Sequence, residues 1–313
     1  MIKVLFHYEA GPNLRAKLDA LKSEGLDVIC CDQTDDEKFE RLLPEIDALW
    51  HALRPVTPEH IAKARSLKLI QKIGVGVNTI DLEAAQIRGI PVCNMPGTNT
   101  RAVAEMTLLL ILSALRIQPR LDALCRSGQW IPDEATRESL QELYGKTVGL
   151  IGFGDIPTLL APILEFMGAK VIYSSRSRKG VPYEHVPLDK LISQSDIVSL
   201  HIPLTEETSH TIGANEIACM KPGAVLINTA RGGLVDEAAL YAALKSGHLR
   251  SAGLDVFDPE PAAASNPLFR LDNVIPAPHV AWLTNETLDR SLEVAIANTL
   301  AAVNGTPLRH RVV

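Results

Sequence analysis

Residues 148–157 read V-G-L-I-G-F-G-D-I-P, an apolar run that ends in two glycines and leads into a segment of helical pattern up to Met167. Glycine permits a tight turn and lets backbone N–H groups come close to a diphosphate. The amino end of the following helix would direct its positive dipole toward the same anion. We therefore predict a strand, a turn and a helix that together bind a dinucleotide. The residues of this predicted turn are Gly152, Phe153, Gly154, Asp155 and Ile156.

The stretch departs from the usual dinucleotide pattern in two places. Pro157 replaces the third glycine, and the acidic residue expected about 20 residues later is absent. Proline is tolerated in the first turn of a helix, so we expect the cofactor to bind; the rival interpretation is a damaged site of weak affinity. A second strand, Val171-Ile172-Tyr173, is followed instead by Ser174, Ser175, Arg176, Ser177 and Arg178.

Length and composition limit the classes of protein. A chain of 313 residues favours two domains, and 46% hydrophobic with 22% charged residues is typical of a globular protein. The net charge of −6 argues against nucleic-acid and membrane-surface partners. We find no signal peptide, no membrane-spanning run and no metal-ligand cluster, and five cysteines fit reduced thiols. We therefore expect a cytoplasmic protein without a metal.

Apolar and amphipathic segments alternate along the chain, which predicts parallel sheets covered on both faces. The expected fold is α/β with two doubly wound parallel-sheet domains. The predicted strands are 3–7, 27–31, 48–51, 69–73 and 91–94 in the first, and 147–151, 170–174, 197–201, 224–228, 251–256 and 273–275 in the second. Residues 102–115 read as a buried apolar helix, 131–142 as irregular, and 286–303 as a final helix.

Three motifs after predicted strands contain side chains suited to acid–base chemistry. Arg231 lies in I-N-T-A-R-G-G-L-V-D, residues 227–236, where a guanidinium can bind a carboxylate with two hydrogen bonds. G-L-D-V-F-D-P-E-P, residues 253–261, contains Asp255 and Glu260, and P-A-P-H-V-A-W, residues 276–282, contains His279. A histidine oriented and charged by a carboxylate is a common general acid/base. Taken singly, Arg231 fits a structural role as well as a functional one, and a lone glutamate or histidine is more often structural than catalytic.

A fourth motif, K-I-G-V-G-V-N-T-I-D at residues 72–81, lies in the first domain. Its two glycines expose backbone N–H groups that could hold a small anion. Taken alone, the stretch is better explained as a plain tight turn.

Together these motifs resemble the D-isomer-specific 2-hydroxyacid dehydrogenases over nearly the whole chain, from G-V-G-V-N-T-I-D through R-A-V-A-E-M to P-H-V-A-W. The resemblance implies that Arg231 anchors the substrate carboxylate, that His279 is the proton donor, and that Glu260 holds and charges His279. The expected substrate residues are Leu53, Arg54, Val75, Gly76, Arg231, His279 and Trp282. For Trp282, packing in the core is an equal alternative.

The resemblance also implies the domain organisation and the remaining cofactor contacts. It predicts a discontinuous flavodoxin-like substrate domain, 1–99 plus 285–313, and a Rossmann dinucleotide-binding domain, 100–284. Substrate would bind in a cleft between these domains, and the helix at 102–115 would form a homodimer interface. Beyond the glycine turn, the expected cofactor residues are Ile202, Pro203, Thr208, Thr229, Ala230 and Asp255.

By family spacing, the acidic residue that would bind the ribose of NAD falls at Ser175. A serine flanked by Arg176 and Arg178 suits the 2′-phosphate of NADP instead, although a solvated basic loop is the plainer alternative. We therefore expect NADPH as the preferred cofactor, with NAD as the alternative, and Ser174, Ser175, Arg176 and Arg178 among its ligands.

The resemblance also implies that the substrate is a small 2-ketoacid. Y-S-S-R-S is most similar to the glyoxylate and hydroxypyruvate reductase branch. Phosphoglycerate dehydrogenase is less favoured because no appended regulatory domain follows the last helix. Formate dehydrogenase is disfavoured because that branch has glutamine in place of Glu260. The alternatives are an NAD-dependent enzyme of other specificity, or a catalytically weak protein that senses dinucleotides, as corepressors of this family do.

Overall fold

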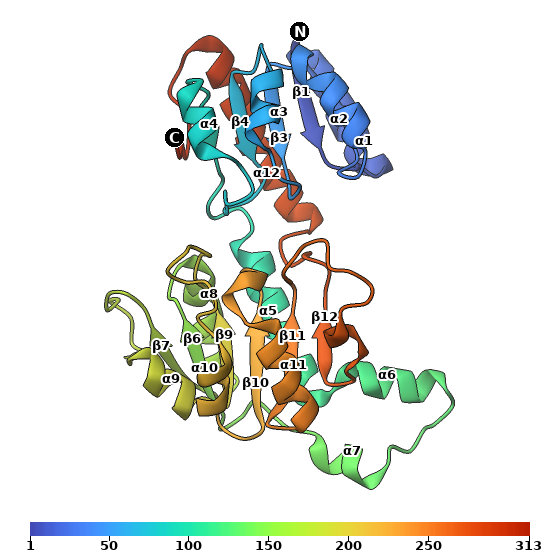
Figure 1. The fold of residues 1–313 in the computed structure, drawn as a ribbon, viewed down its shortest axis with the longest axis vertical. Helices are drawn as coiled ribbons and strands as arrows, with labels where there is room; N and C mark the ends of the chain where they lie inside the picture. The colour runs from blue at the N-terminus through green and yellow to red at the C-terminus, as the bar shows by residue number, and fades with distance from the viewer. The chain divides into compact units, whose positions relative to one another are not determined.

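The computed structural model describes all residues 1–313 and divides into two compact units. Unit 1 comprises residues 1–99 and 284–313, and unit 2 comprises residues 100–283. Each unit has one sheet in which every strand pair is parallel, and Figure 1 shows helices on both faces of each sheet. The predicted fold class, two parallel α/β sheets, is confirmed.

The sheet of unit 1 has five strands in the order β2-β1-β3-β4-β5. Its strands are β1 (Ile2–His7), β2 (Leu26–Cys30), β3 (Ala48–His51), β4 (Leu69–Lys72) and β5 (Val92–Cys93). Its helices are α1 (Pro12–Ala20), α2 (Asp36–Leu42), α3 (Pro58–Lys63), α4 (Leu82–Ile87) and α12 (Asn285–Asn304), with short 3₁₀ turns η1 (Leu21–Glu24) and η2 (Leu43–Glu45).

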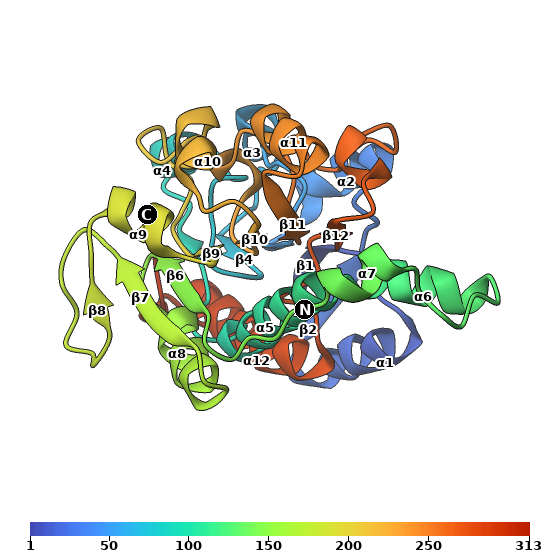
Figure 2. The ribbon, with the colours of Figure 1, turned by 90° about the horizontal axis from the view of Figure 1, so that it is seen from below.

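Side-chain alternation along the strands of unit 1 builds two apolar layers. Leu5 and Leu49 join Phe39 of α2 and Ile61 of α3 in a core on one face of the sheet. On the other face, Trp50 donates a hydrogen bond to Thr299 of α12 at 2.9 Å. Figure 2 shows α1 and α12 together on that side and α2 and α3 opposite them.

The helices of unit 1 begin at polar caps that the sequence supplies. Asp35, Thr57 and Asp81 accept hydrogen bonds from the first-turn amides of α2, α3 and α4. Pro58 directly follows its cap, where the absent N–H has no partner within the helix. Because each cap follows a strand, the helix starts lie near the carboxyl edge of the sheet.

The sheet of unit 2 has seven strands in the order β12-β11-β10-β9-β6-β7-β8. Its strands are β6 (Thr147–Ile151), β7 (Lys170–Ser174), β8 (Glu184–His185), β9 (Ile197–Leu200), β10 (Ala224–Asn228), β11 (Leu249–Leu254) and β12 (Val274–Pro276). The order reverses between β6 and β9, because the chain runs outward from β6 to β8 and then returns to place β9 on the other side. Such a reversal opens a crevice at the carboxyl ends of the two strands.

Helices cover both faces of this sheet. They are α5 (Thr100–Arg116), α6 (Gln118–Arg126), α7 (Glu134–Ser139), α8 (Asp155–Phe166), α9 (Leu188–Gln194), α10 (Ala214–Cys219) and α11 (Glu237–Ser246), with η3 (Gly232–Leu234) and η4 (Pro267–Arg270). One apolar core lies under α5 and α8, and the other lies under α9, α10 and α11. Figure 2 shows these two layers on opposite sides of the sheet.

Two local features differ from the sequence-based expectation. The segment expected to be irregular contains α7, because Asp133 accepts a hydrogen bond from Thr136 N and caps the helix. The two-residue strand β8 was not predicted. Figures 1 and 2 show α6 and α7 on an excursion away from the sheet of unit 2.

No single helix is long and apolar enough to cross a membrane, and only α5 with α6 taken together, bent by 65°, meet the criteria of length and composition.

Candidate active site

The glycine turn after β6 lies at the point where the strand order of unit 2 reverses. Gly152 has a φ of +96°, and a Cβ there would lie 2.4 Å from the carbonyl oxygen of His201, at the end of β9. The backbone of the turn is held by a hydrogen bond from Gly152 N to Ser174 O at 2.8 Å. Only glycine fits both constraints, so the turn has the backbone that a bound diphosphate requires.

The first turn of α8 presents backbone amides without a side-chain cap. Gly154 is the N-cap, and no side chain bonds the first amides. Pro157 lies in this turn, where its missing N–H removes no intrahelical bond. Asp155 is exposed in the same turn, and its charge would oppose that of a diphosphate. The first turn of α8 therefore fits a dinucleotide, although the charge of Asp155 is unfavourable.

The side chains flanking the turn are mostly apolar and partly buried. Phe153 is 6% exposed and lies between the rings of Tyr173 and Tyr183, so only its backbone faces the turn. Ile156 packs against the core under α8, and Ile202 packs against the core on the other face.

A short polar loop follows Ile202 at the end of β9. Thr208 donates a hydrogen bond to Pro203 O at 2.7 Å, which closes the loop. The roles of Ile202, Pro203 and Thr208 as cofactor contacts stay predictions.

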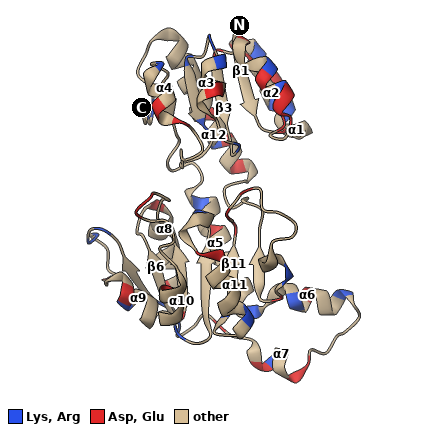
Figure 3. Ribbon diagram, viewed as in Figure 1, with Lys and Arg blue, Asp and Glu red and all other residues tan.

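The loop after β7 is compact and basic. Ser175 donates to Ser177 O at 2.7 Å, Lys179 N donates to the Tyr173 hydroxyl at 2.8 Å, and an imidazole nitrogen of His185 lies 3.0 Å from Ser175 O. Arg176 and Arg178 are exposed on this loop and form no ion pair. Figure 3 shows the resulting basic tip between β7 and β8. The loop is therefore ordered by its own hydrogen bonds while its two guanidinium groups remain available.

The turn after β10 positions Arg231. The Asn228 side chain accepts from Ala230 N at 3.0 Å and donates to Arg231 O at 2.8 Å. The guanidinium donates to Ala230 O at 2.6 Å. Burial lowers the pKa of Arg231, and the nearby Glu260 carboxylate opposes that effect. Since arginine stays charged in proteins, the turn presents a half-buried cation at the carboxyl end of a central strand.

Glu260 and His279 form the polar pair that the sequence predicts. Nδ1 of His279 lies 2.6 Å from Glu260 Oε2, and Glu260 Oε1 accepts from Phe257 N at 3.0 Å. Burial raises the pKa of Glu260, but hydrogen bonding to His279 and the nearby positive charges outweigh burial, and the net pKa is lowered. The carboxylate therefore stays ionised and fixes the imidazole through Nδ1, which leaves Nε2 as the nitrogen that can exchange a proton with a substrate.

Asp255 holds the backbone on which His279 sits. Its oxygens accept from Val280 N at 2.8 Å and from Ala281 N at 2.9 Å, and its own carbonyl accepts from His279 N at 2.7 Å. The side chain is 1% exposed, and burial raises its pKa. His279 has a φ of +55°, which is uncommon for a residue other than glycine, and these bonds hold it there. The predicted cofactor contact of Asp255 stays a prediction.

The expected substrate residues of unit 1 lie on loops after neighbouring strands. Leu53 and Arg54 follow β3, and their backbone amides both donate to the Gln33 side chain at 3.1 Å. Arg54 pairs with Asp36 at 2.7 Å. Gln33 was not predicted, because a glutamine in a loop matches no functional pattern.

The second of these loops, after β4, carries Val75 and Gly76. Val75 is 42% exposed, and its carbonyl accepts from Asn94 at 2.9 Å. Trp282, in unit 2, is 7% exposed and donates its indole N–H to His279 O at 3.1 Å. The tryptophan thus helps to hold the histidine loop. Its role against the substrate stays a prediction, as do those of Val75 and Gly76.

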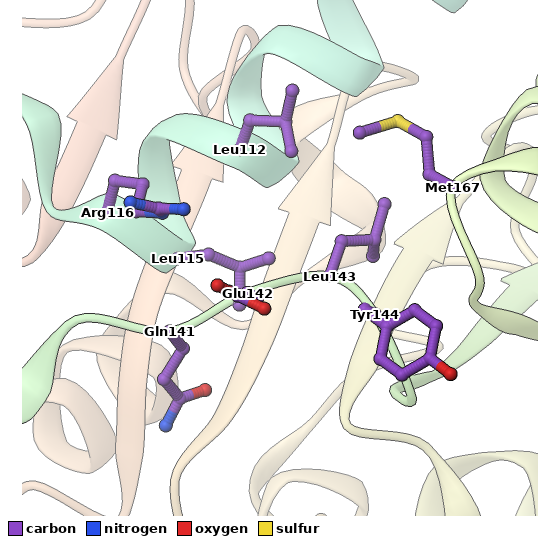
Figure 4. A pocket seen from close by; sticks show the side chains of 8 residues that line it. All are labelled: Leu112, Leu115, Arg116, Gln141, Glu142, Leu143, Tyr144 and Met167. Carbon is purple, nitrogen blue, oxygen red and sulfur yellow. The ribbon is translucent and has the colours of Figure 1, made fainter.

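A cavity of about 220 Å³ lies elsewhere in unit 2, between the end of α5 and the segment before β6 (Figure 4). Its lining is mainly apolar and consists of Leu112, Leu115, Arg116, Gln141, Glu142, Leu143, Tyr144 and Met167. None of the predicted cofactor or catalytic residues lines it, so the cavity takes no part in the predicted chemistry.

Comparison with known proteins shows which family this chain is similar to. Residues 108–281 match the family model of the D-isomer specific 2-hydroxyacid dehydrogenase NAD binding domain. A glyoxylate reductase of Thermococcus litoralis is 42% identical over 83% of this chain and 82% of its own length. A hydroxypyruvate reductase of Thermotoga maritima is 38% identical over 84% and 86%. A Thermus thermophilus protein of known structure superposes with a TM-score of 0.91 at 36% identity, over all of both chains. The chain is an NAD(P)-dependent oxidoreductase that belongs to the D-isomer specific 2-hydroxyacid dehydrogenase family.

Proposed function

We propose that the protein reduces small 2-ketoacids, of the size of glyoxylate and hydroxypyruvate, to D-2-hydroxyacids, with NADPH as the preferred hydride donor. One observation carries the proposal. Nδ1 of His279 lies 2.6 Å from Glu260 Oε2, and this pair lies at the same carboxyl edge of the sheet as the half-buried Arg231. A proton donor and a carboxylate-binding cation are the two groups that the reduction of a ketoacid needs.

Each residue of this set has a defined task in the proposed reaction. A bound nicotinamide supplies the hydride to the carbonyl carbon. Arg231 binds the substrate carboxylate and stabilises the charge that develops on the carbonyl oxygen. His279 donates a proton to that oxygen from Nε2 and accepts it in the reverse direction. Glu260, ionised because its pKa is lowered, stabilises the imidazolium and keeps the ring oriented.

The two units divide the remaining work in this proposal. Residues 100–284 bind the dinucleotide through the glycine turn, and residues 1–99 with 285–313 bind the substrate. Leu53, Arg54, Val75 and Gly76 are assigned to the carboxylate and side chain of the ketoacid. Their position on loops after β3 and β4 supports the assignment, because ligands of parallel sheets bind at the carboxyl ends of strands.

The preference for NADPH rests on the loop after β7. Arg176 and Arg178 are exposed without ion pairs, and the loop is ordered by its own bonds. Two such cations can bind a 2′-phosphate with little loss of conformational entropy. Arg176→Ala should raise the KM for NADPH and leave that for NADH nearly unchanged. Arg270→Ala removes another exposed arginine of unit 2 and serves as the matched control. An unchanged KM for NADPH in Arg176→Ala would refute the assignment.

The reaction itself is tested by steady-state kinetics with a panel of 2-ketoacids, including glyoxylate and hydroxypyruvate, against both nicotinamides. We expect turnover of the small ketoacids, with the higher kcat/KM in the presence of NADPH. Higher kcat/KM with NADH would contradict the proposed preference for NADPH, and higher kcat/KM with a bulkier ketoacid would contradict the proposed preference for small substrates. Saturable NADPH binding without turnover of any ketoacid would favour the dinucleotide-sensing alternative.

We also propose that the protein is a homodimer through the face formed by α5 and α8. Leu159, Ile163 and Phe166 form one stripe along α8, with Phe166 92% exposed, and Leu109 of α5 is 56% exposed. The cavity of Figure 4 borders this face through Tyr144 and Met167, which are also exposed. Contiguous apolar surface of this kind marks an interface, and a second copy of the chain is the occupant that the family resemblance implies.

Light scattering tests this proposal. The wild type should have the mass of two chains, and Phe166→Glu should shift it toward one chain. Ile87→Glu, which charges another strongly exposed apolar residue, on α4 of unit 1, should leave the mass unchanged. A monomeric wild type would refute the interface.

A further inference from the structure

The turn that carries Arg231 is tied to α5 by one buried pair of hydroxyl groups. Thr229 Oγ1 lies 2.9 Å from Thr107 Oγ1, and the two side chains are 8% and 0% exposed. Thr107 Oγ1 also donates to Val103 O, one turn earlier in α5, at 2.7 Å. Because a hydroxyl has one hydrogen, Thr107 accepts in the pair and Thr229 donates.

The opposite side of the same turn lies against the loop that carries Glu260. A Cβ on Gly232 would lie 2.0 Å from the carbonyl oxygen of Phe257, so the two backbones are in direct contact. Phe257 N in turn donates to Glu260. Residues 229–232 are therefore bounded by a helix hydroxyl on one side and by the Glu260 loop on the other. Within the turn, Asn228 fixes Ala230 and Arg231 by two further bonds.

We propose that Thr107 is a positioning residue for Arg231, which it holds through Thr229. The inference rests on the proposed role of Arg231 in binding the ketoacid carboxylate. Thr107 touches neither substrate nor cofactor in this account. Its hydroxyl sets how far the turn sits from α5, and thus where the guanidinium lies relative to Glu260 and His279. Binding of a carboxylate by two parallel hydrogen bonds tolerates little displacement of the guanidinium.

The rival account is that the pair only attaches α5 to the sheet, and the chain supplies a matched control for it. Ser251, in β11, is fully buried and donates to Ala114 O of the same helix at 3.2 Å. Ser251→Ala and Thr107→Val each remove one buried hydroxyl bond between α5 and the sheet. Ser251 lies near the start of β11, however, whereas Thr229 follows the end of β10. A purely structural effect should therefore appear in both variants, whereas an effect on the position of Arg231 should appear only in Thr107→Val.

The experiment compares Thr107→Val, Thr107→Ser and Ser251→Ala in the full-length protein. The readouts are Tm, the KM and kcat for glyoxylate, the Kd of NADPH, and the Kd of oxalate, a two-carbon dicarboxylate that mimics the substrate. We expect Thr107→Val to raise the KM for glyoxylate and the Kd of oxalate by roughly three- to thirtyfold, with NADPH binding within about twofold of wild type. Thr107→Ser keeps the hydroxyl and should restore both values. Ser251→Ala should lower Tm by a similar amount and change neither.

Equal KM and Kd values in Thr107→Val and Ser251→Ala would overturn the proposal, as would failure of Thr107→Ser to restore them. Should Thr107→Val fail to fold, Thr229→Val removes the same bond from its other end and must give the same rise in the oxalate Kd. The proposed function fails separately, when the wild type turns over no ketoacid at all. In that case the oxalate Kd of the same variants still reports whether Thr107 positions the guanidinium.

Discussion

At the scale of single residues, the geometry around His279 accounts for its proposed role as the proton donor. Glu260 fixes Nδ1, Trp282 bonds the carbonyl oxygen of His279, and Asp255 accepts from the two amides that follow. Rotation of the imidazole would therefore break its bond to Glu260, and displacement of the backbone that carries it would break the bonds to Trp282 and Asp255. Preorganisation of this kind places the proton before the substrate arrives.

Replacing His279 by glutamine tests this role directly. Glutamine retains a hydrogen-bonding side chain but cannot donate a proton as an acid, so kcat should fall by roughly 100- to 10,000-fold. The Kd of NADPH, measured by fluorescence titration, should stay nearly constant. His248→Gln makes the same chemical change at a histidine whose side chain bonds Ile217 O, and it should retain full turnover. Substantial turnover by His279→Gln would exclude His279 as the acid.

Asp155 is expected to weaken cofactor binding, because it places a negative charge in the first turn of α8, the helix that we propose faces the diphosphate. Asp155→Asn removes that charge and should tighten NADPH binding roughly two- to fivefold at low ionic strength. The gain should shrink as salt is added. Asp189→Asn removes an exposed acid from the first turn of α9 and should leave the Kd unchanged. Weaker binding by Asp155→Asn would mean that the carboxylate itself contacts the cofactor.

At the scale of elements, the separation of two loops sets the distance between Arg231 and Glu260. Gly232 lies in η3, and its Cα faces the Phe257 carbonyl with no room for a methyl group. Two adjacent glycines therefore have different consequences. At Gly233 the nearest atoms to an added Cβ are side-chain atoms of Leu204 at 3.1 Å and Asp258 at 3.3 Å, which can move.

Gly232→Ala should therefore force the two loops apart. We expect a loss of stability of about 1 to 3 kcal/mol from overpacking, together with a large drop in kcat/KM. Gly233→Ala introduces the same methyl group one residue later and should cost much less in both respects. Urea denaturation and steady-state kinetics measure the two effects. Equal behaviour of the two variants would show that the Phe257 contact does not set the geometry.

At the scale of the whole molecule, buried neutral histidines make the fold sensitive to acid. His7 and His51 end neighbouring strands of unit 1, and His201 directly follows β9 of unit 2. Burial, together with the nearby positive charge of Arg54, lowers the pKa of His7 to about 4. Burial likewise lowers the pKa of His201 to about 4 and that of His51 well below its usual value. Neither ring nitrogen of His7 has a hydrogen-bond partner.

Because these pKa values lie below the unfolded value of about 6.5, the unfolded chain binds more protons at acidic pH. The contribution to stability is complete above pH 6.5 and is lost as pH falls toward 4. His7→Phe keeps an aromatic ring against Phe39, which now stacks on His7 at 4.0 Å. The difference in free energy of unfolding between the variant and the wild type should be about 1 to 2 kcal/mol more favourable to the variant at pH 5 than at pH 7.5. An equal difference at both values of pH, measured by urea denaturation, would refute the buried neutral state.

The sequence predicted much of this molecule because some residues have few other uses. The glycine turn and the order of Arg231, Glu260 and His279 each pair a residue type with a local geometry. Thr107 and Gln33 could not be found in this way: a threonine within an apolar helix resembles core packing, and the loop that Gln33 supports lies 20 residues away. The strand β8 has only two residues, both polar, and so carries no alternation.

The interrupted course of unit 1 along the chain has a consequence for its synthesis. The sheet of residues 1–99 is completed by α12, which covers Trp50, and by Asn298, which bonds Gln71 of β4 at 2.7 Å. All of unit 2 is translated between these partners. All of unit 2 therefore leaves the ribosome before unit 1 is complete, and one apolar side of the sheet of unit 1 stays uncovered until residues 284–313 have been synthesised.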